Sequence, residues 1–198
     1  MKRWHWLFLA FIVLFGSCTY GFLNALRSET YEGRVVDEES GAPLAGAVVT
    51  AIWYRTPAIQ MEGSLYFLNA QETVTDADGR FSLQVSPGLD WDPTTVRVKE
   101  PAIVVYNPGY EPLWLATMAN RGFSTVREFI TALENGARLK LRKLKTKEEL
   151  ATYSSRTSVG VGEMPLERIP NLMGAINIQS QMAGLVPYPD FPEKGKHP

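Results

Sequence analysis

Pairs of carboxylates are the residues of this chain whose type and spacing come closest to a catalytic arrangement. Asp76 and Asp78 lie close together in one polar segment, and Asp90 and Asp92 flank Trp91 in another. Two carboxylates can act as general acid and general base in glycoside hydrolysis when an apolar pocket raises the pKa of one of them. These segments are polar and turn-like and give no sign of such a pocket. We therefore expect a protein that is not an enzyme, and a hydrolase with a carboxylate pair is the less favoured alternative.

Histidine and cysteine, the usual residues of nucleophilic catalysis and zinc binding, are scarce. The chain has two histidines, His5 and His197, and one cysteine, Cys18. The residues between Cys18 and His197 include no histidine and no cysteine. A globular body made of them cannot hold a Ser-His-Asp or Cys-His site, nor a zinc site of His and Cys ligands. The segment 76–79 is similar to the start of a calcium loop, but the bidentate Glu that completes such a loop is missing. We expect no metal and no cofactor.

The first 18 residues have the organisation of an export signal. Lys2 and Arg3 form a basic start, and residues 6–15 are all apolar. Small residues then precede Cys18, an arrangement that resembles the lipobox of bacterial lipoproteins, with Phe15 where that motif usually has Leu. The resemblance implies that Cys18 is lipidated and becomes the first residue of the mature protein.

Two alternatives concern the same segment. Residues 4–26 contain no Asp, Glu, Lys or Arg and are long enough to span a bilayer as an uncleaved anchor. A secretory signal cut near Ser17 would instead release the protein. All three interpretations place the body outside the cytoplasm. We expect an exported bacterial protein held in the cell envelope, on the periplasmic face or the outer surface.

Beyond this segment, short apolar runs alternate with turn residues, which is typical of an all-β domain. One run places Val48, Thr50 and Ile52 on one face of a strand and Val49 and Ala51 on the other. The sequence predicts a hairpin loop at residues 75–79 and strands at residues 31–37, 47–54, 64–74, 81–85, 96–98, 102–106, 113–116 and 138–142.

Four stretches of this region, 33–37, 41–49, 75–83 and 107–111, resemble the carboxypeptidase-regulatory-like domain of bacterial proteins. The resemblance implies an antiparallel, seven-stranded transthyretin-like or Ig-like β-sandwich. In that family the domain is usually an accessory module beside a peptidase or a stand-alone domain of surface proteins. It implies a fold more firmly than a function, because one fold carries many functions.

Helical periodicity and capping residues predict three helices outside the strands. One is an inserted helix at residues 125–135, and the others give a partly helical C-terminal tail, at residues 146–154 and 172–183, before a proline-rich end. The chain is accordingly divided into a lipoprotein-type signal at 1–18, a tether at 19–30, the β-sandwich at 31–145 and the tail at 146–198.

Aromatic residues and one basic run are candidate binding features. Trp91, Tyr110 and Trp114 stand in or beside turns, where exposed rings could stack on sugars, although aromatic rings more often pack in a core. The basic run at 138–147 could contact anionic lipid headgroups, but it suits an edge strand guarded by lysines better. A formal net charge of -1 argues against a nucleic-acid partner.

Together these observations predict a non-catalytic, membrane-anchored envelope lipoprotein that presents a β-sandwich as an interaction module. The expected partners are the membrane, through the N-terminal lipid or anchor, and an envelope protein that meets the sandwich loops or the tail helix. A glycan-binding module that uses Trp91 is the alternative from another class.

Overall fold

The computed structural model describes residues 29–57, 65–86, 95–97, 100–115, 117–155 and 164–188, and within them the fold is rich in β-structure. A three-stranded sheet has the order β4-β1-β7, and in a four-stranded sheet the central β2 pairs β3 on one side and β5 and β6 on the other. The strands are β1 (Glu29–Asp37), β2 (Val48–Pro57), β3 (Tyr66–Val74), β4 (Arg80–Val85), β5 (Thr95–Arg97), β6 (Ala102–Tyr106) and β7 (Ala137–Leu141).

The predicted helices all form, close to the expected positions. Thr125 caps the inserted helix by accepting the Glu128 amide, and Thr146 and Glu149 complete a full capping box on the next one. The third ends at Gly184, whose φ of 77° is left-handed, and starts two residues earlier than expected, with Pro170 in its first turn in place of a capping Asn171. The helices are η1 (Met118–Arg121), α2 (Val126–Glu134), α3 (Lys147–Thr152), η3 (Leu166–Arg168) and α4 (Pro170–Ala183).

Strand β2 is buried on both faces, as its nearly continuous apolar run indicates. Val49 and Ala51 belong to a core cluster that the two sheets share with α2. Val48 and Ile52 belong to a second cluster on the opposite face of the same strand. The predicted division of this strand into two faces is confirmed.

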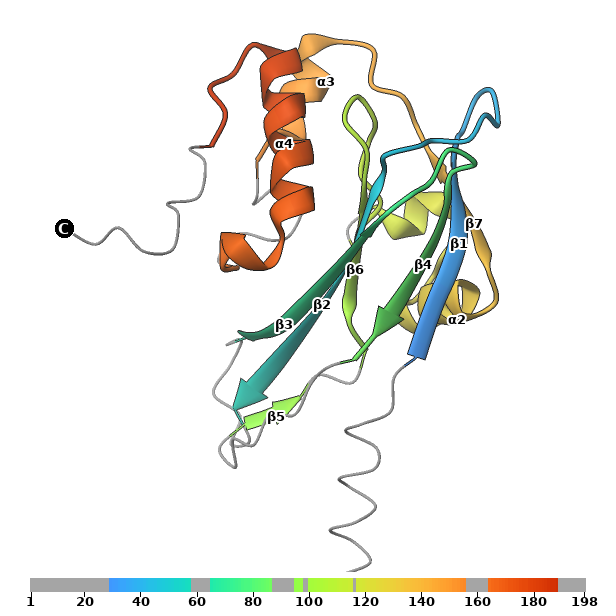
Figure 1. Ribbon diagram of the computed structural model, residues 1–198, viewed down its shortest axis with the longest axis vertical. Helices are drawn as coiled ribbons and strands as arrows, with labels where there is room; N and C mark the ends of the chain where they lie inside the picture. Colours follow the sequence, from blue (N-terminus) through green and yellow to red (C-terminus); the bar gives the residue numbers. More distant parts are fainter. Residues whose placement is uncertain are drawn as a thin grey trace, which may run out of the picture.

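Helix α4 covers the second face of the four-stranded sheet. Its Leu172, Met173 and Ile176 are buried against side chains of β2, β3 and β6. Figure 1 shows the resulting order of layers, with α4 on one side of the four-stranded sheet and the three-stranded sheet on the other. The segment after residue 146 is thus part of the packed body over residues 164–188.

Three expectations about the strands are wrong. β7 runs parallel to β1, and not antiparallel, with its first residue opposite Gly33. The reason is that α2 returns the chain to the end of the sheet where β1 begins. Residues 75–79 form a turn that leads from β3 in one sheet to β4 in the other, so they close no hairpin. Leu113 makes an isolated bridge to Val105 in place of a strand.

The crossing turn is tied down locally. The Thr75 hydroxyl donates to the Leu44 carbonyl at 2.7 Å and accepts the Ala47 amide at 2.9 Å, which satisfies the backbone where the chain changes sheets. Gly79 has a φ of 71°, and a Cβ there would lie 2.4 Å from the Val35 carbonyl oxygen. Only glycine fits this close approach.

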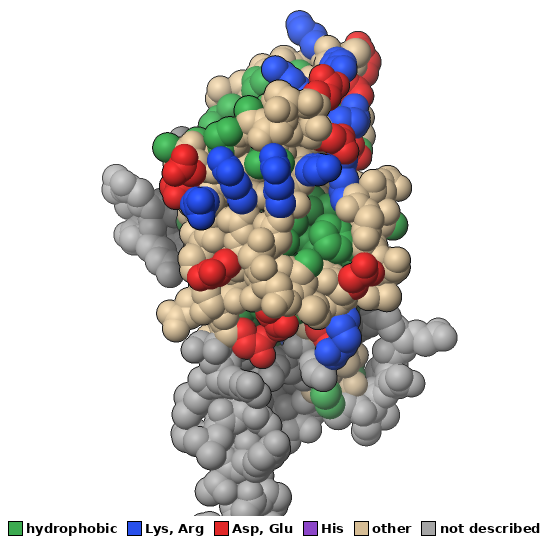
Figure 2. Space-filling model, turned by 90° about the vertical axis from the view of Figure 1, so that its right-hand side faces the viewer, with side chains coloured by type: hydrophobic (Ala, Val, Ile, Leu, Met, Phe, Trp, Pro, Cys, Tyr) green, Lys and Arg blue, Asp and Glu red, His purple; other side chains and the backbone are tan. Residues whose placement is uncertain are grey.

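The outer face of the three-stranded sheet is polar, whereas the outer face of the four-stranded sheet is apolar and covered by α4. Strand β4 alternates exposed Arg80, Ser82 and Gln84 with buried Phe81 and Leu83, so its polar side faces solvent. β1 and β7 contribute further basic side chains to this face. Figure 2 shows Lys and Arg side chains gathered in a row across it.

Glu72 of β3 caps the N-terminus of α4 from a distance. Its carboxylate accepts the Asn171 and Leu172 amides, each at 2.9 Å, and the Thr50 hydroxyl at 3.2 Å. The helix has no capping side chain of its own because Ile169 stands at its N-cap position. Burial raises the pKa of Glu72 above its ordinary value, while these hydrogen bonds favour the ionised form.

We expect Glu72→Ala to lower the free energy of unfolding by about 0.5–2 kcal/mol, because it removes the acceptor that caps the first amides of α4. Glu72→Gln keeps one acceptor oxygen and should lose less. Denaturant titration gives the stability, and hydrogen exchange at the Leu172 amide locates the loss. Glu167→Ala, at an exposed residue of η3, is the control. Equal stability of Glu72→Ala and the control would contradict the capping role.

Candidate functional site

An apolar pocket of about 420 Å³ lies beside the edge of β6. Strand β2 supplies Ile52 and Tyr54 to its wall, and α2 supplies Val126 and Phe129. The segment after β6 adds Trp114, Leu115 and Met118, while β6 itself and the residues before it form the floor. The full lining is Ile52, Tyr54, Leu65, Glu100, Pro101, Ala102, Ile103, Val104, Trp114, Leu115, Met118, Val126 and Phe129.

Among the described residues, part of the β6 edge that points away from β2 has no partner. Val105 and Leu113 exchange two amide-to-carbonyl bonds of 2.8 and 2.9 Å, so the polar groups of Val105 point away from β2. Ile103 lies two residues earlier on the strand and has the same orientation. The chain turns away after Leu113, where the Trp114 amide donates to the Thr117 hydroxyl. On the edge that points away from β2, no described strand therefore pairs with β6 beside Ile103.

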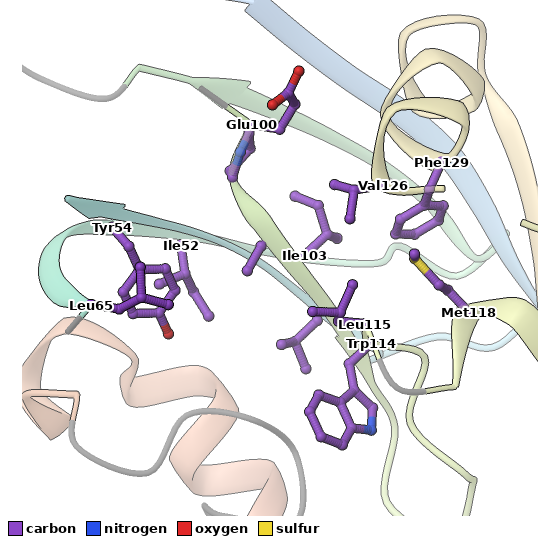
Figure 3. Close-up of a pocket in the computed structure, with 13 residues that line it drawn as sticks. Ile52, Tyr54, Leu65, Glu100, Ile103, Trp114, Leu115, Met118, Val126 and Phe129 are labelled. Atoms are coloured by element: carbon purple, nitrogen blue, oxygen red, sulfur yellow. The ribbon is translucent and has the colours of Figure 1, made fainter. Parts of the chain in front are cut away.

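The pocket lies on both sides of this open edge. Ile52 and Tyr54 are on the side of α4, and Ile103 and Phe129 are on the side of the shared core. Figure 3 shows the two groups on either side of the β6 ribbon, with Leu115 between them. An extended segment sends successive side chains to opposite faces, so a strand added at this edge would place side chains in both halves.

Polar groups of the pocket are few. Glu100 is the charged lining residue, and its carboxylate is paired with Arg127. Burial raises the pKa of Tyr54, because it disfavours the charged phenolate. The Trp114 indole Nε1 is buried and has no hydrogen-bond partner among the described residues. This arrangement suits the binding of apolar groups.

Of the predicted aromatic candidates, the two that the structure describes, Tyr110 and Trp114, lie in different clusters. Tyr110 is half-buried against the shared core, and burial together with the nearby Asp37 carboxylate raises its pKa. Trp114 is half-buried against the α4 cluster and lines the pocket. Trp91 lies outside the described residues, as does Cys18. Across the described segments, no helix is long and apolar enough to cross a membrane.

The predicted carboxylate pairs do not form a described acid-base site. Asp76 accepts the amides of Asp78 and Arg80 at 2.9 and 2.8 Å, and thus stabilises its own turn. Asp90 and Asp92 lie outside the described residues. In the part of the chain that the structure describes, no group of three or more His, Cys, Asp or Glu could hold a metal ion.

Sequence reasoning missed a buried charge cluster around Glu111. One oxygen of this carboxylate accepts Arg121 at 2.9 Å and Arg142 at 2.7 Å, and the other accepts the Tyr153 hydroxyl at 3.2 Å. Arg142 also donates to Glu149 at 2.8 Å. Both oxygens of Glu111 are thus engaged by donors, so the cluster fastens α3 to the sheets and leaves no free base. No motif marked it, because its members come from four separate segments.

The acid limit of stability should depend on Glu149. Hydrogen bonds from the Lys145 amide and the Arg142 guanidinium hold its pKa below the ordinary value. Such a carboxylate stabilises the fold above its unfolded pKa of about 4.3, and this contribution is lost as the pH falls through the lower folded pKa. Glu149→Gln keeps a residue that completes capping boxes.

We therefore expect Glu149→Gln to flatten the decline of the unfolding midpoint below about pH 4.3, relative to Glu167→Gln. Thermal melts followed by circular dichroism at pH values from 2.5 to 7 measure this midpoint. The range is chosen to bracket the unfolded pKa. Identical acid limbs in the two variants would show that Glu149 is not linked to folding.

No model of a protein family matches the sequence, and neither does any curated protein. Two solved structures are weakly similar. A 9R-lipoxygenase from Cyanothece PCC8801 aligns with 46% of this chain at 16% identity and a TM-score of 0.25, and the alignment spans 13% of the lipoxygenase. An alternative pilotin from the type II secretion system of Vibrio cholerae aligns over its whole length with 61% of this chain, at 14% identity and a TM-score of 0.25. TM-scores this low do not establish a common fold.

Proposed function

We propose that the protein is a non-catalytic envelope lipoprotein, anchored to a membrane through Cys18, whose body binds a partner protein. The body is then a seven-stranded β-sandwich of the transthyretin-like type, in the manner of carboxypeptidase-regulatory-like domains. Two features support this fold: the two sheets share one core, and Gly46 and Gly79, in the stretches that carry the resemblance, have the left-handed φ values of 77° and 71°.

The observation that carries the binding function is the apolar pocket around the open edge of β6. A partner segment in extended conformation can pair with the backbone beside Ile103 and insert alternate apolar side chains into the two halves of the pocket. The bridge between Val105 and Leu113 already occupies the neighbouring position on this edge, which supports strand pairing there. Leu115, with 58% of its surface exposed, stands at the mouth, where a partner would cover it.

A photo-crosslinking amino acid at Leu115 should therefore capture one envelope protein in living cells. The matched control is the same amino acid at Ile178, an apolar residue of α4 with a similar exposed fraction of 52%. We expect a discrete adduct from position 115 and little or none from position 178, resolved by gel shift and mass spectrometry. Equal labelling from both positions would contradict a specific site, and polysaccharide adducts would favour the glycan-binding alternative.

The anchor is tested by the intact mass of protein extracted from membranes. The wild-type chain should begin at Cys18 and carry the added mass of acyl groups. Cys18→Ala should lack that mass and keep the residues before position 18, because lipoprotein processing requires the cysteine. A wild-type protein without acyl mass would overturn lipidation, and one that still contains residues 1–17 would favour the uncleaved anchor.

A further inference from the structure

Three arginines stand in a line across the outer face of the three-stranded sheet. In the strand register, Arg34 of β1 lies opposite Arg80 of β4 on one side and Arg138 of β7 on the other. The residues that follow them on their strands, Val35, Phe81 and Leu139, are buried in the shared core, so the alternation directs the three arginine side chains to the other face. Lys140 follows on β7, opposite Val36. These four residues are the basic row, and Figure 2 shows Lys and Arg side chains in such a row on this face.

The like charges of the basic row repel one another and therefore destabilise the folded state. Adjacent strands are about 4.8 Å apart, and like charges directly opposite each other destabilise a sheet. Among the described ion pairs none involves a member of the row; their cations are Arg121, Arg127, Arg142 and Lys145.

The hydrogen bonds of the row go to backbone carbonyls, although the carboxyl groups of Glu32 and Asp76 line the same hollow as Arg34 and Arg80. Arg34 donates to the Asp78 carbonyl at 2.7 Å and Arg138 to the Gly41 carbonyl at 3.2 Å, and a carbonyl does not neutralise a guanidinium. The nearby acids are few: Glu32, on the same face, accepts the Ser82 hydroxyl at 3.4 Å, and the Asp76 carboxylate accepts amides of its own turn.

No described element packs on this face, in contrast to the outer face of the other sheet, which α4 covers. Arg80 and Arg138 are exposed on this face, and Arg34 between them is partly buried. Guanidinium forks bind phosphate oxygens in two parallel hydrogen bonds, and a line of them matches a surface that carries many phosphates.

We propose that the basic row docks the body onto the anionic lipid headgroups of the membrane to which the chain is anchored. The inference rests on the proposed anchor. Arg34 follows Cys18 by 16 positions, a stretch that spans at most about 55 Å when extended, so the row can reach the bilayer surface. The tether keeps the row at a high effective concentration beside the headgroups, so weak individual contacts suffice.

Docking in this way decides which surfaces stay accessible. The three-stranded sheet faces the lipid, while α4, on the opposite side of the layers, faces away from it. The edge of β6 belongs to the other sheet and stays open to a partner. The row thus orients a module that the tether alone would leave free to rotate.

The test uses the full chain in nanodiscs of phosphatidylcholine alone or with one quarter phosphatidylglycerol. A fluorescent amino acid is placed at Ser82, on the basic face, or at Gln181, on α4, and energy transfer to a headgroup dye is measured. We expect transfer from position 82, and not from position 181, to rise when phosphatidylglycerol is present. Raising the salt concentration should reverse the rise, because salt screens exposed charges.

The double variant Arg80→Gln/Arg138→Gln should weaken docking about 25-fold, since each basic residue near an anionic surface contributes about 5-fold. The control Arg127→Gln/Lys147→Gln removes the same charge from α2 and α3 and should dock like wild type. If energy transfer from position 82 does not change when phosphatidylglycerol is present, or if the two double variants dock equally, the docking proposal is wrong and the proposed anchor is unaffected. A chain that leaves the nanodiscs altogether would refute the anchor instead.

Discussion

The burial of β2 on both faces is the constraint on which the rest of the structure depends. An apolar strand in the middle of a sheet must be covered twice, because each exposed apolar side chain costs free energy in proportion to its area. The three-stranded sheet and α2 cover the side of Val49 and Ala51, and α4 covers the side of Val48 and Ile52. The C-terminal helix is therefore part of the core of this protein, and its removal would expose a sheet face.

Polar contacts decide where that helix lies. Glu72 caps its first turn from β3, and at the other end the buried Gln179 accepts the Gly109 amide at 2.9 Å and donates to the Leu150 carbonyl at 3.2 Å. Apolar packing alone tolerates sliding of a helix on a sheet, whereas buried amides without partners are costly. The Glu111 cluster fixes α3 in the same way, so the chain after β7 is held at several points by groups that cannot be paired in another register.

Two surfaces remain that this packing does not use, and they differ in chemistry. The edge of β6 exposes backbone groups beside an apolar pocket, and the outer face of the three-stranded sheet exposes cations in a line. Sheet edges and opposed like charges both weaken a fold when left alone. We propose that the tethered body uses both surfaces, the basic row to contact lipid and the edge of β6 to bind a protein.

The sequence by itself determined the local elements, because strand alternation, capping residues and glycine turns act over a few residues. It predicted the two faces of β2, the capping box of Thr146 and Glu149, and the end of α4 at Gly184. Only the tertiary structure decided the direction of β7, the passage of residues 75–79 between sheets, and the assembly of the pocket and the basic row. Those features join residues far apart in the sequence, as when Arg34 lies opposite Arg138, and periodicity within one strand contains no information about which strand becomes its neighbour.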